Sequence, residues 1–462
     1  MLPAIGAGTL YALIVALAAW HHEPWADEAQ SWLLARDATL LDLWTRLLHY
    51  EGTPGLWQSL LHLAILLGAP YRALNLISAA CGLGACWLIL RHGPFPMALR
   101  LALPFTFFLC YQYAVIARSY SLVPVLLFAA AILYRQGPSK IAALTVVLAL
   151  LAAVSVHGMA LSASIWLAFY VDLARERQKL PAVVWRTAFI VAAGYWASIL
   201  LLVLAAWPAS DNMFVRRPYW SFEHLVTVAG KAVRGGFAGE LLLSLVAIAL
   251  SLPLLRRGRT LVLFLFSLVS LFLLNGIVYS QVWHYGLVFL CWLFALWVAA
   301  SRSTMGWPAI ASLAIVIAVQ CYWTAEAVSY DWDSTYSASK DAAGYLRQSG
   351  IARQRLFAIG YSCTGIQPYF PANIFANVNG GHNPSYWDWS LRNQVNENSA
   401  KLASLQPEYV IVGYKGAYEK DLWTRQVRDS GYRLLRHFEG NTFWESDILE
   451  PESFDLYQRP AP

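Results

Sequence analysis

Eleven long apolar runs recur along the first 323 residues of this chain, and they decide which folds are open to it. A helix needs about 20 mostly apolar residues to cross a bilayer, and each run reaches or approaches that length. They are 3–20, 72–90, 99–114, 117–134, 139–156, 158–173, 187–206, 238–255, 260–278, 283–300 and 306–323. Apolar residues make up 58% of the chain and charged residues only 13%, which excludes a soluble enzyme, a disordered chain and a nucleic-acid-binding protein.

The chain changes character after residue 323. Residues 1–323 carry 20 Lys and Arg against 11 Asp and Glu, a net charge of +9, whereas 324–462 carry 13 against 16, a net charge of −3. In the second part helix-like stretches precede short apolar runs, namely 338–349 before 356–359, 390–404 before 409–412, and 418–430 before 432–435. Such alternation is typical of an α/β domain. We predict a mainly α, polytopic membrane protein with eleven transmembrane helices in 1–323, followed by a small soluble α/β domain, 324–462.

The basic residues predict which loops face the cytoplasm, because cytoplasmic loops are enriched in Lys and Arg. The short apolar run 54–68 decides the assignment. If it does not cross the membrane, one set of loops holds twelve basic and two acidic residues. These are Arg91, Arg100, Arg135, Lys140, Arg175, Arg177, Lys179, Arg186, Arg256, Arg257, Arg259 and Arg302, with Asp172 and Glu176. We therefore expect 54–68 to dip into the membrane or lie in its plane, the N-terminus to be cytoplasmic, and the tail to lie outside.

The first outer loop, 21–53, contains two helical patterns. In 40–50 one stripe is apolar and the charged residues lie off it, and 28–36 is similar but shorter. The stripe consists of Leu40, Leu43, Trp44, Leu47 and Leu48. Amphipathic helices of this kind lie in the membrane interface, so we expect interfacial helices here. The preceding span could be a signal peptide with a cleavage triplet at 16–18, but it lacks a basic leading region, which favours an uncleaved anchor.

Ionisable residues gather at the outer ends of the predicted spans. Asp27 and Glu28 follow the first span, Arg118 lies between the third and fourth, His157 between the fifth and sixth, and His284 at the start of the tenth. An ionisable side chain near membrane depth is costly, so it is a candidate for function. Because all five are predicted on one side, we expect them to converge on a cleft at the membrane surface.

These residues also have structural interpretations. Asp27 could cap the helix at 28–36, with Gln30 completing a capping box and Glu28 favouring the helix dipole. Arg118 could be an interfacial arginine that extends its charge into water. Both interpretations stay open beside the functional ones.

Alternatives also stay open for His157 and for two arginines of a later loop. His157 could bind phosphate or a divalent metal ion, or could be a hydrogen-bonded histidine at a helix end. Arg216 and Arg217 lie in the long, aromatic-rich outer loop 207–237. They are either an ordinary solvated pair or contacts to the phosphate of a substrate.

Three short motifs carry a resemblance to a known enzyme class. They are HEPWADEA at 22–29, EGTPGLW at 51–57 and ARSYSL at 117–122. In this order, after a single first span, they resemble the GT-C membrane glycosyltransferases, which include the bacterial protein O-mannosyltransferases and lipid A aminoarabinose transferases. Family members often carry Lys or His at the position of Thr53 and an additional Asp near Ser119, both of which this chain lacks.

The resemblance implies transfer of a sugar from a polyprenyl-phosphate donor to an acceptor hydroxyl of a glycan, lipid or protein, outside a bacterial inner membrane. In such a reaction Asp27 would be the general base, supported by Glu28, and C1 would be inverted. Arg118 and His284, with Arg216 and Arg217, would bind the departing phosphate. A divalent metal ion is a candidate cofactor, with His157 as its candidate ligand.

Two other functions remain as alternatives. A transporter or flippase for a lipid-linked or anionic substrate would place its charges near the middle of the bilayer, often in repeated halves, whereas these charges lie at one surface and no repeat is evident. An O-antigen polymerase or ligase would share the lipid-linked donor but would lack the early acidic pair. The sequence therefore favours the glycosyltransferase.

Overall fold

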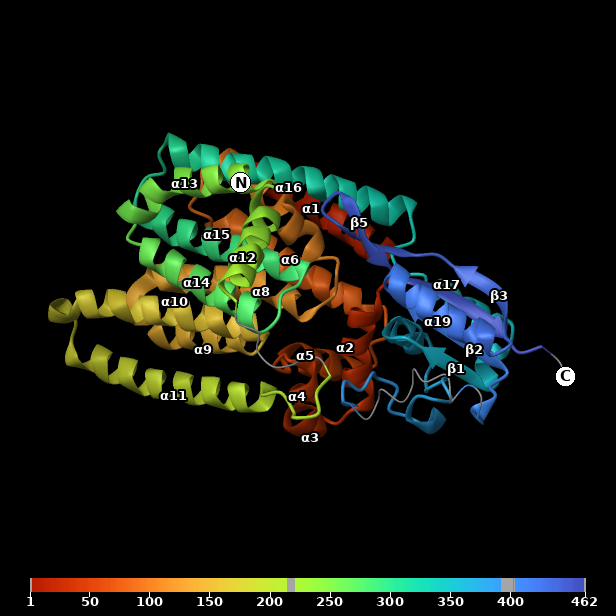
Figure 1. The fold of residues 1–462 in the computed structure, drawn as a ribbon. Helices are drawn as coiled ribbons and strands as arrows, with labels where there is room; N and C mark the ends of the chain where they lie inside the picture. The colour runs from red at the N-terminus through yellow and green to blue at the C-terminus, as the bar shows by residue number, and fades with distance from the viewer. Residues whose placement is uncertain (1, 214–220, 392–401, 403, 461–462) are drawn as a thin grey trace.

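A computed structural model describes residues 2–213, 221–391, 402 and 404–460 of the protein. The chain is mainly helical, and a small domain containing a β-sheet forms its C-terminal end. The helical part and the sheet domain lie at opposite ends of the molecule, with the short helices of the first predicted loop between them on one side (Figure 1). The predicted order of a mainly helical part followed by a small domain with a sheet is thus confirmed at this coarse level.

Among the residues that the structure describes, seven helical stretches are long and apolar enough to cross a membrane. They are α1 (Leu2–His21), α6 (Ala73–His92), Ser119–Ala152, α10 (Val156–Arg175), α11 (Ala182–Ala206), Val282–Arg302 and α16 (Trp307–Asp333). An eighth is present if α12 (Phe222–Phe237) and α13 (Leu241–Arg257), bent by 74°, form one span. These helices are compatible with a multi-pass membrane protein.

Other predicted runs form shorter helices. Ser119–Ala152 contains α8 (Leu122–Gln136) and α9 (Ile141–Ala152), which pack against each other, and 260–278 forms α14 (Leu261–Ile277). The run 54–68 forms the eleven-residue helix α5 (Leu56–Leu66). Fewer stretches qualify as spans than the eleven apolar runs suggested, because the runs 117–134 and 139–156 lie in the single stretch Ser119–Ala152. In addition, α13 and α14 have 17 residues each, which makes them shorter than the bilayer core.

The run 99–114 is not the regular helix that its apolarity predicts, so this prediction was wrong. It is divided into α7 (Met97–Ala102), the 3-10 turn η2 (Leu103–Phe105) and the π-helical turn η3 (Phe108–Gln112). Pro104 lacks a backbone N–H, and Thr106 is extended at ψ 150°, which ends the first helix. The chain then turns toward Arg118 inside the protein.

The helix at the centre of the bundle is α15 (Tyr285–Arg302), whose side chains are almost all buried. Its Gly286 lies against Phe108 and Tyr113, so that a Cβ at this position would collide with the Phe108 ring. The close approach of α15 to the irregular segment after Thr106 therefore depends on a glycine. The last apolar helix, α16, continues to Asp333, ten residues beyond the predicted end of its span at 323.

The two helical patterns of the first loop are confirmed as helices. One is α2 (Ala26–Asp37), and the other comprises α3 (Leu40–Asp42), the π turn η1 (Leu43–Leu47) and α4 (Leu48–Glu51). Leu43, Leu47 and Leu48 are buried against Leu33 and Leu34 of α2. The predicted apolar stripe therefore packs partly against the protein itself.

The tail contains a four-stranded sheet in the order β1-β2-β6-β3 and a separate hairpin of β4 and β5. The strands are β1 (Leu356–Ile359), β2 (Tyr409–Tyr414), β3 (Arg433–Phe438), β4 (Asn441–Trp444), β5 (Asp447–Pro451) and β6 (Ser453–Gln458), with helices α17 (Ser339–Gln348) and α19 (Ala417–Asp429). Among the strand pairs of this sheet in the described residues, β1 and β2 are parallel and the other two pairs are antiparallel. The three predicted strands correspond to β1, β2 and β3, whereas most of the predicted helix 390–404 lies outside the described residues.

The β4–β5 hairpin joins the tail to the helical part. The Trp444 ring lies 5.2 Å from that of Phe107 and 5.9 Å from that of Phe108, and Phe443 stacks on Tyr330 at 4.4 Å. Aromatic pairs at these separations are attractive beyond the area that they bury. The tail is therefore fixed on the helical bundle rather than merely linked to it.

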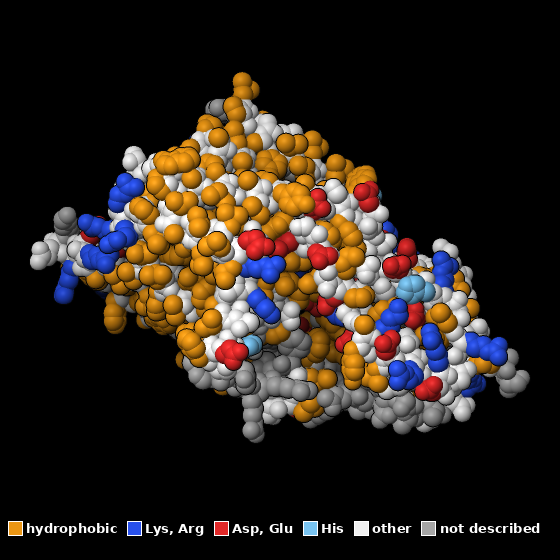
Figure 2. Space-filling view, turned by 45° about the horizontal axis from the view of Figure 1, so that its top comes forward, with side chains coloured by type: hydrophobic (Ala, Val, Ile, Leu, Met, Phe, Trp, Pro, Cys, Tyr) orange, Lys and Arg blue, Asp and Glu red, His pale blue; other side chains and the backbone are white. Residues whose placement is uncertain are grey.

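The surface has an apolar middle and charged ends. Hydrophobic side chains cover most of the helical part, whereas Lys and Arg gather at the end away from the tail (Figure 2). Exposed basic residues at the connections between helices include Arg135, Lys140, Arg175, Arg256 and Arg257. An apolar band between charged ends is the surface expected of a protein embedded in a bilayer.

We expect Gly286→Ala to destabilise the protein, because its new methyl group collides with Phe108 in the packed core. Overpacking of this kind typically costs about 1–3 kcal/mol. The matched control is Gly194→Ala in α11, where nothing lies within 4 Å of the added Cβ. Thermal unfolding of the purified protein in detergent should show a lower midpoint for Gly286→Ala alone. Equal midpoints for the two variants would contradict the proposed packing constraint.

Candidate functional site

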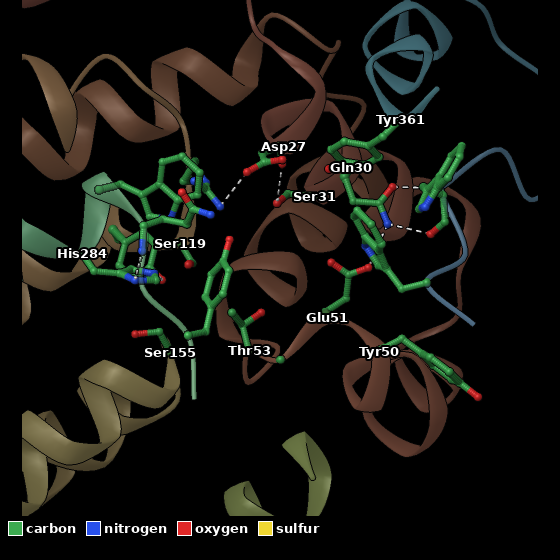
Figure 3. Close-up of a pocket in the computed structure, with 18 of the residues that line it drawn as sticks. Asp27, Gln30, Ser31, Tyr50, Glu51, Thr53, Ser119, Ser155, His284 and Tyr361 are labelled. Carbon is green, nitrogen blue, oxygen red and sulfur yellow. Dashed lines mark hydrogen bonds and ion pairs between the residues drawn. The ribbon is translucent and has the colours of Figure 1, made fainter. Parts of the chain in front are cut away.

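A cavity of about 490 Å³ lies between the helical part and the tail. Its walls come from the first turn of α2, the loop after α4, the segment around Arg118, the start of α10, the segment before α15, and the tail. In Figure 3, Asp27 lies between Ser119 and His284 on one side and Gln30, Glu51 and Tyr361 on the other. The cavity thus brings together four of the residues selected from the sequence, Asp27, Arg118, His157 and His284.

Asp27 forms ion pairs across this cavity. One carboxylate oxygen lies 2.9 Å from Arg118 Nη2, and the other lies 3.9 Å from Lys415 Nζ. Burial raises the pKa of Asp27. The charges of Arg118 and Lys415 and a hydrogen bond from Tyr361 together lower it by more than burial raises it, so the pKa lies below its usual value. Asp27 is therefore an anion at neutral pH.

The interpretation of Asp27 as a helix cap is wrong. The helix α2 begins at Ala26, so the residue in the cap position is Trp25. The carboxylate that accepts the Trp25 backbone N–H belongs to Glu28, at 3.1 Å. The adjacent carboxylates thus have different surroundings, with Asp27 in the cavity and Glu28 behind its wall.

Glu28 is fully buried and binds three donors. Besides Trp25 N–H, its oxygens accept the backbone N–H of Ala117 at 2.6 Å and lie 3.0 Å from His22 Nε2. The other nitrogen of His22 lies 3.0 Å from a carboxylate oxygen of Asp331 near the end of α16. Glu28 therefore joins α2, the end of α1, α16 and the segment that carries Arg118.

Arg118 has one guanidinium nitrogen engaged and another available. Nη2 pairs with Asp27, whereas Nη1 is buried without a hydrogen-bond partner among the described residues. Its side chain is 19% exposed and lies over the Trp283 ring at 4.4 Å. An arginine that extends into water would not be buried in this way, and a buried donor without a partner is costly unless a ligand binds it.

The two histidines lie together, with ring centres 4.0 Å apart. His284 Nδ1 accepts the backbone N–H of Gln281 at 3.1 Å, and its Nε2 lies 2.9 Å from the Tyr120 hydroxyl. His157 Nε2 lies 2.8 Å from Asn275 Oδ1. Both nitrogens of His284 are engaged, and the described part of the chain holds no group of three or more His, Cys, Asp or Glu that could bind a metal ion. A divalent metal ion with His157 as its ligand stays a prediction.

Several cavity residues were not selected from the sequence. Glu51 was noted only as part of a motif, and its carboxylate accepts a hydrogen bond from Gln30 Nε2 at 2.8 Å. Burial and the negative charge of Asp27 raise the pKa of Glu51, and the hydrogen bond from Gln30 lowers it. The result is a pKa of about 7.

The tail contributes Tyr361, Trp387, Trp389 and Lys415 to the cavity. No local sequence pattern marks these four, because long-range contacts bring them to the cavity. Arg216 and Arg217 lie outside the described residues.

The cavity therefore offers an anion-binding group beside an ionised carboxylate. Arg118 Nη1 can donate a hydrogen bond to a phosphate oxygen while Nη2 still contacts Asp27. Asp27 can accept a proton from a hydroxyl group bound next to it. These two capacities are those that group transfer from a phosphate ester to an alcohol requires.

We expect the protein to lose stability at alkaline pH through His22. Burial lowers the pKa of His22, but Asp331 and Glu28 raise it by more, to about 10 from its usual 6.5. This contribution is fully present below pH 6.5 and is lost as the pH rises through about 10. Unfolding temperatures measured across that range should fall more steeply for the native protein than for His22→Gln. Parallel pH profiles would show that the His22 charge does not stabilise the fold.

No family model matches this chain, and no curated protein matches its sequence. The residues of the cavity and their geometry therefore carry the functional proposal.

Proposed function

We propose that this protein is a membrane glycosyltransferase that moves a sugar from a polyprenyl-phosphate donor to an acceptor hydroxyl. The observation that carries the proposal is the contact between Asp27 and Arg118 in the cavity, with Arg118 Nη1 left without a partner among the described residues. The resemblance of three sequence motifs to the GT-C class supports the same reaction. The acceptor is a glycan, a lipid or a protein.

In the proposed reaction the donor phosphate binds Arg118. An arginine is suited to this role, because its planar fork makes paired contacts to phosphate oxygens. The bond between C1 and the phosphate oxygen breaks with inversion, and the departing polyprenyl phosphate takes the electron pair. Arg118 stabilises the charge that develops on it, assisted by His284 through Tyr120. Arg216 and Arg217 remain predicted phosphate contacts.

Asp27 is the proposed general base. Burial raises the pKa of Asp27, but Arg118 and Lys415 lower it by more and hold it below its usual value. The donor phosphodiester, a monoanion, competes for the positive charge of Arg118 when it binds there, which raises the proton affinity of Asp27. The base thus becomes stronger when the donor is bound. Glu28 supports it by holding α2 and Ala117 together.

We further propose that the chain crosses the bacterial inner membrane eleven times, with the N-terminus in the cytoplasm and the tail outside. The basic residues at the end of the bundle away from the tail support this orientation. The cavity would then lie at the outer face of the inner membrane. There the short helices of the first loop leave access for a lipid tail. Charges at one surface, rather than at mid-membrane, favour the enzyme over a transporter.

Asp27→Asn is expected to lower sugar transfer by about 10²–10⁴-fold, the usual effect of losing a general base. Asparagine is close to aspartate in size but cannot accept the proton. Because the variant also removes the competitor for Arg118, it should bind farnesyl phosphate, a short polyprenyl phosphate, at least as tightly as the native protein. Transfer is measured with polyprenyl-phosphate sugars, and binding by tryptophan fluorescence.

The control for Asp27→Asn is Asp42→Asn, which removes another aspartate paired with an arginine in the same loop but outside the cavity. It should keep native transfer. Near-native transfer by a folded Asp27→Asn protein would falsify the assignment of Asp27 as the base.

Arg118→Lys should weaken farnesyl phosphate binding and lower transfer about tenfold or more, because a lysine cannot reproduce a forked contact to phosphate. The matched control is Arg302→Lys. Arg302 also pairs with a carboxylate, at 2.8 Å, and lies near an aromatic ring, but at the far end of the bundle. Unchanged donor affinity and turnover in Arg118→Lys would remove Arg118 from the phosphate site.

Single cysteines test the orientation. Lys420→Cys in α19 and Arg257→Cys in α13 introduce thiols at exposed positions of the tail and of the basic end. An impermeant thiol reagent added to whole cells should label the first and not the second. The native protein, whose six cysteines are buried or half-buried, gives the background. Labelling of Arg257→Cys alone would reverse the proposed orientation.

A further inference from the structure

Three aromatic rings from the tail form one wall of the cavity. Tyr361 lies 5.7 Å from Trp387 and 4.7 Å from Trp389 between ring centres, and the two tryptophans are 6.0 Å apart. The rings are tilted or perpendicular to one another rather than stacked flat. Their arrangement therefore leaves ring surface for a ligand in the cavity that all three line.

Polar groups lie beside these rings. Gln30 binds the backbone of Trp387 in both directions, at 2.8 Å and 2.9 Å, and also donates to Glu51. The indole Nε1 of Trp387 is buried without a hydrogen-bond partner among the described residues. A wall of rings with an amide, a carboxyl group and an unused N–H donor is suited to a polyol, whose C–H faces contact rings while its hydroxyls form hydrogen bonds.

The wall is held in place from the helical part as well as from the tail. Asn212 forms an isolated β-bridge with Ser390, and Met213 N–H donates to the Trp389 carbonyl at 2.8 Å. Gln30 ties the same segment to α2. Because the wall is fixed by three separate segments, its rings are preorganised for a ligand.

The wall also lies directly next to the proposed base. Tyr361 donates a hydrogen bond to Asp27. Lys415 lies 4.2 Å from the Trp25 ring centre and 5.1 Å from that of Tyr361. A hydroxyl group of a ligand on this wall could therefore reach the Asp27 carboxylate from the side opposite Ser119 and His284 (Figure 3).

We propose that Tyr361, Trp387 and Trp389, with Gln30 and Glu51, form the acceptor subsite, and that the acceptor is a saccharide. The inference rests on the proposed glycosyltransferase function. The acceptor hydroxyl oxygen forms the bond to C1 of the donor sugar, its proton passes to Asp27, and the C1–phosphate bond breaks with its electrons on the phosphate. A lipid acceptor would leave the polar groups of this wall without hydrogen-bond partners.

Binding of saccharides tests the subsite without any donor. The full-length protein in detergent is applied to an array of short oligosaccharides and of serine-containing peptides. Saccharide binding is expected, and Trp387→Leu and Trp389→Leu should each weaken it about tenfold, the effect of losing one ring contact. The control Trp332→Leu removes an exposed tryptophan outside this cavity and should leave binding unchanged.

Trp387→Phe keeps a ring but loses the N–H donor, so it should fold and show a smaller loss than Trp387→Leu. Binding of farnesyl phosphate should stay native in all three wall variants. Preference for peptides, absence of saccharide binding, or equal binding by the wall variants would overturn the acceptor proposal even if sugar transfer is found. Saccharide binding that depends on the wall, without sugar transfer, would instead overturn the proposed function and retain the subsite.

Discussion

The buried carboxylate of Glu28 is the interaction on which the rest of the site depends. It accepts the backbone N–H of Ala117, 89 residues further along the chain, and so fixes that segment against the first turn of α2. The residue before Glu28 then meets the residue after Ala117, which pairs Asp27 with Arg118. Consecutive side chains on a helix point in different directions, so one carboxylate of the acidic pair can hold the structure while the other faces the cavity. A buried carboxylate is stable only when it is paired and hydrogen-bonded, and His22 with two backbone N–H groups supplies these partners.

Much of the fold could be predicted from the sequence, because apolar length and amphipathic spacing are local properties. They correctly predicted α1, α6, α10 and the helices of the first loop. They failed at 99–114, where composition is apolar throughout but Pro104 and the extended Thr106 interrupt the helix. In the site, the convergence of Asp27 and Arg118 was predicted from charges at the ends of spans. The cavity-facing residues of the tail could not be found this way, since their position depends on how the tail docks.

The tail completes the site rather than standing apart from it. Glu452, which precedes β6, accepts the backbone N–H of Ala26 at 3.0 Å and the hydroxyl of Ser362 at 3.1 Å. It thus binds a free N–H at the N-terminus of α2, where a carboxylate is favoured by the helix dipole. Burial raises the pKa of Glu452 to about 7, against the opposing charge of Lys415. The position of Asp27 therefore depends on both ends of the chain.

The packing of the tail on the helical part also determines which charged groups surround Asp27, the proposed base. Asp27 lies between Arg118 from the helical part and Lys415 from the tail, and Lys415 also lies 3.5 Å from Glu450. The positive charges of Arg118 and Lys415 stabilise the Asp27 anion, which makes Asp27 a weak base. In the proposed reaction, a donor phosphate on Arg118 Nη1 would share the positive charge that stabilises the Asp27 anion, so the affinity of Asp27 for a proton would rise when the donor is present. A carboxylate held between two cations can in this way remain inactive toward water and become a base in the complex that needs one.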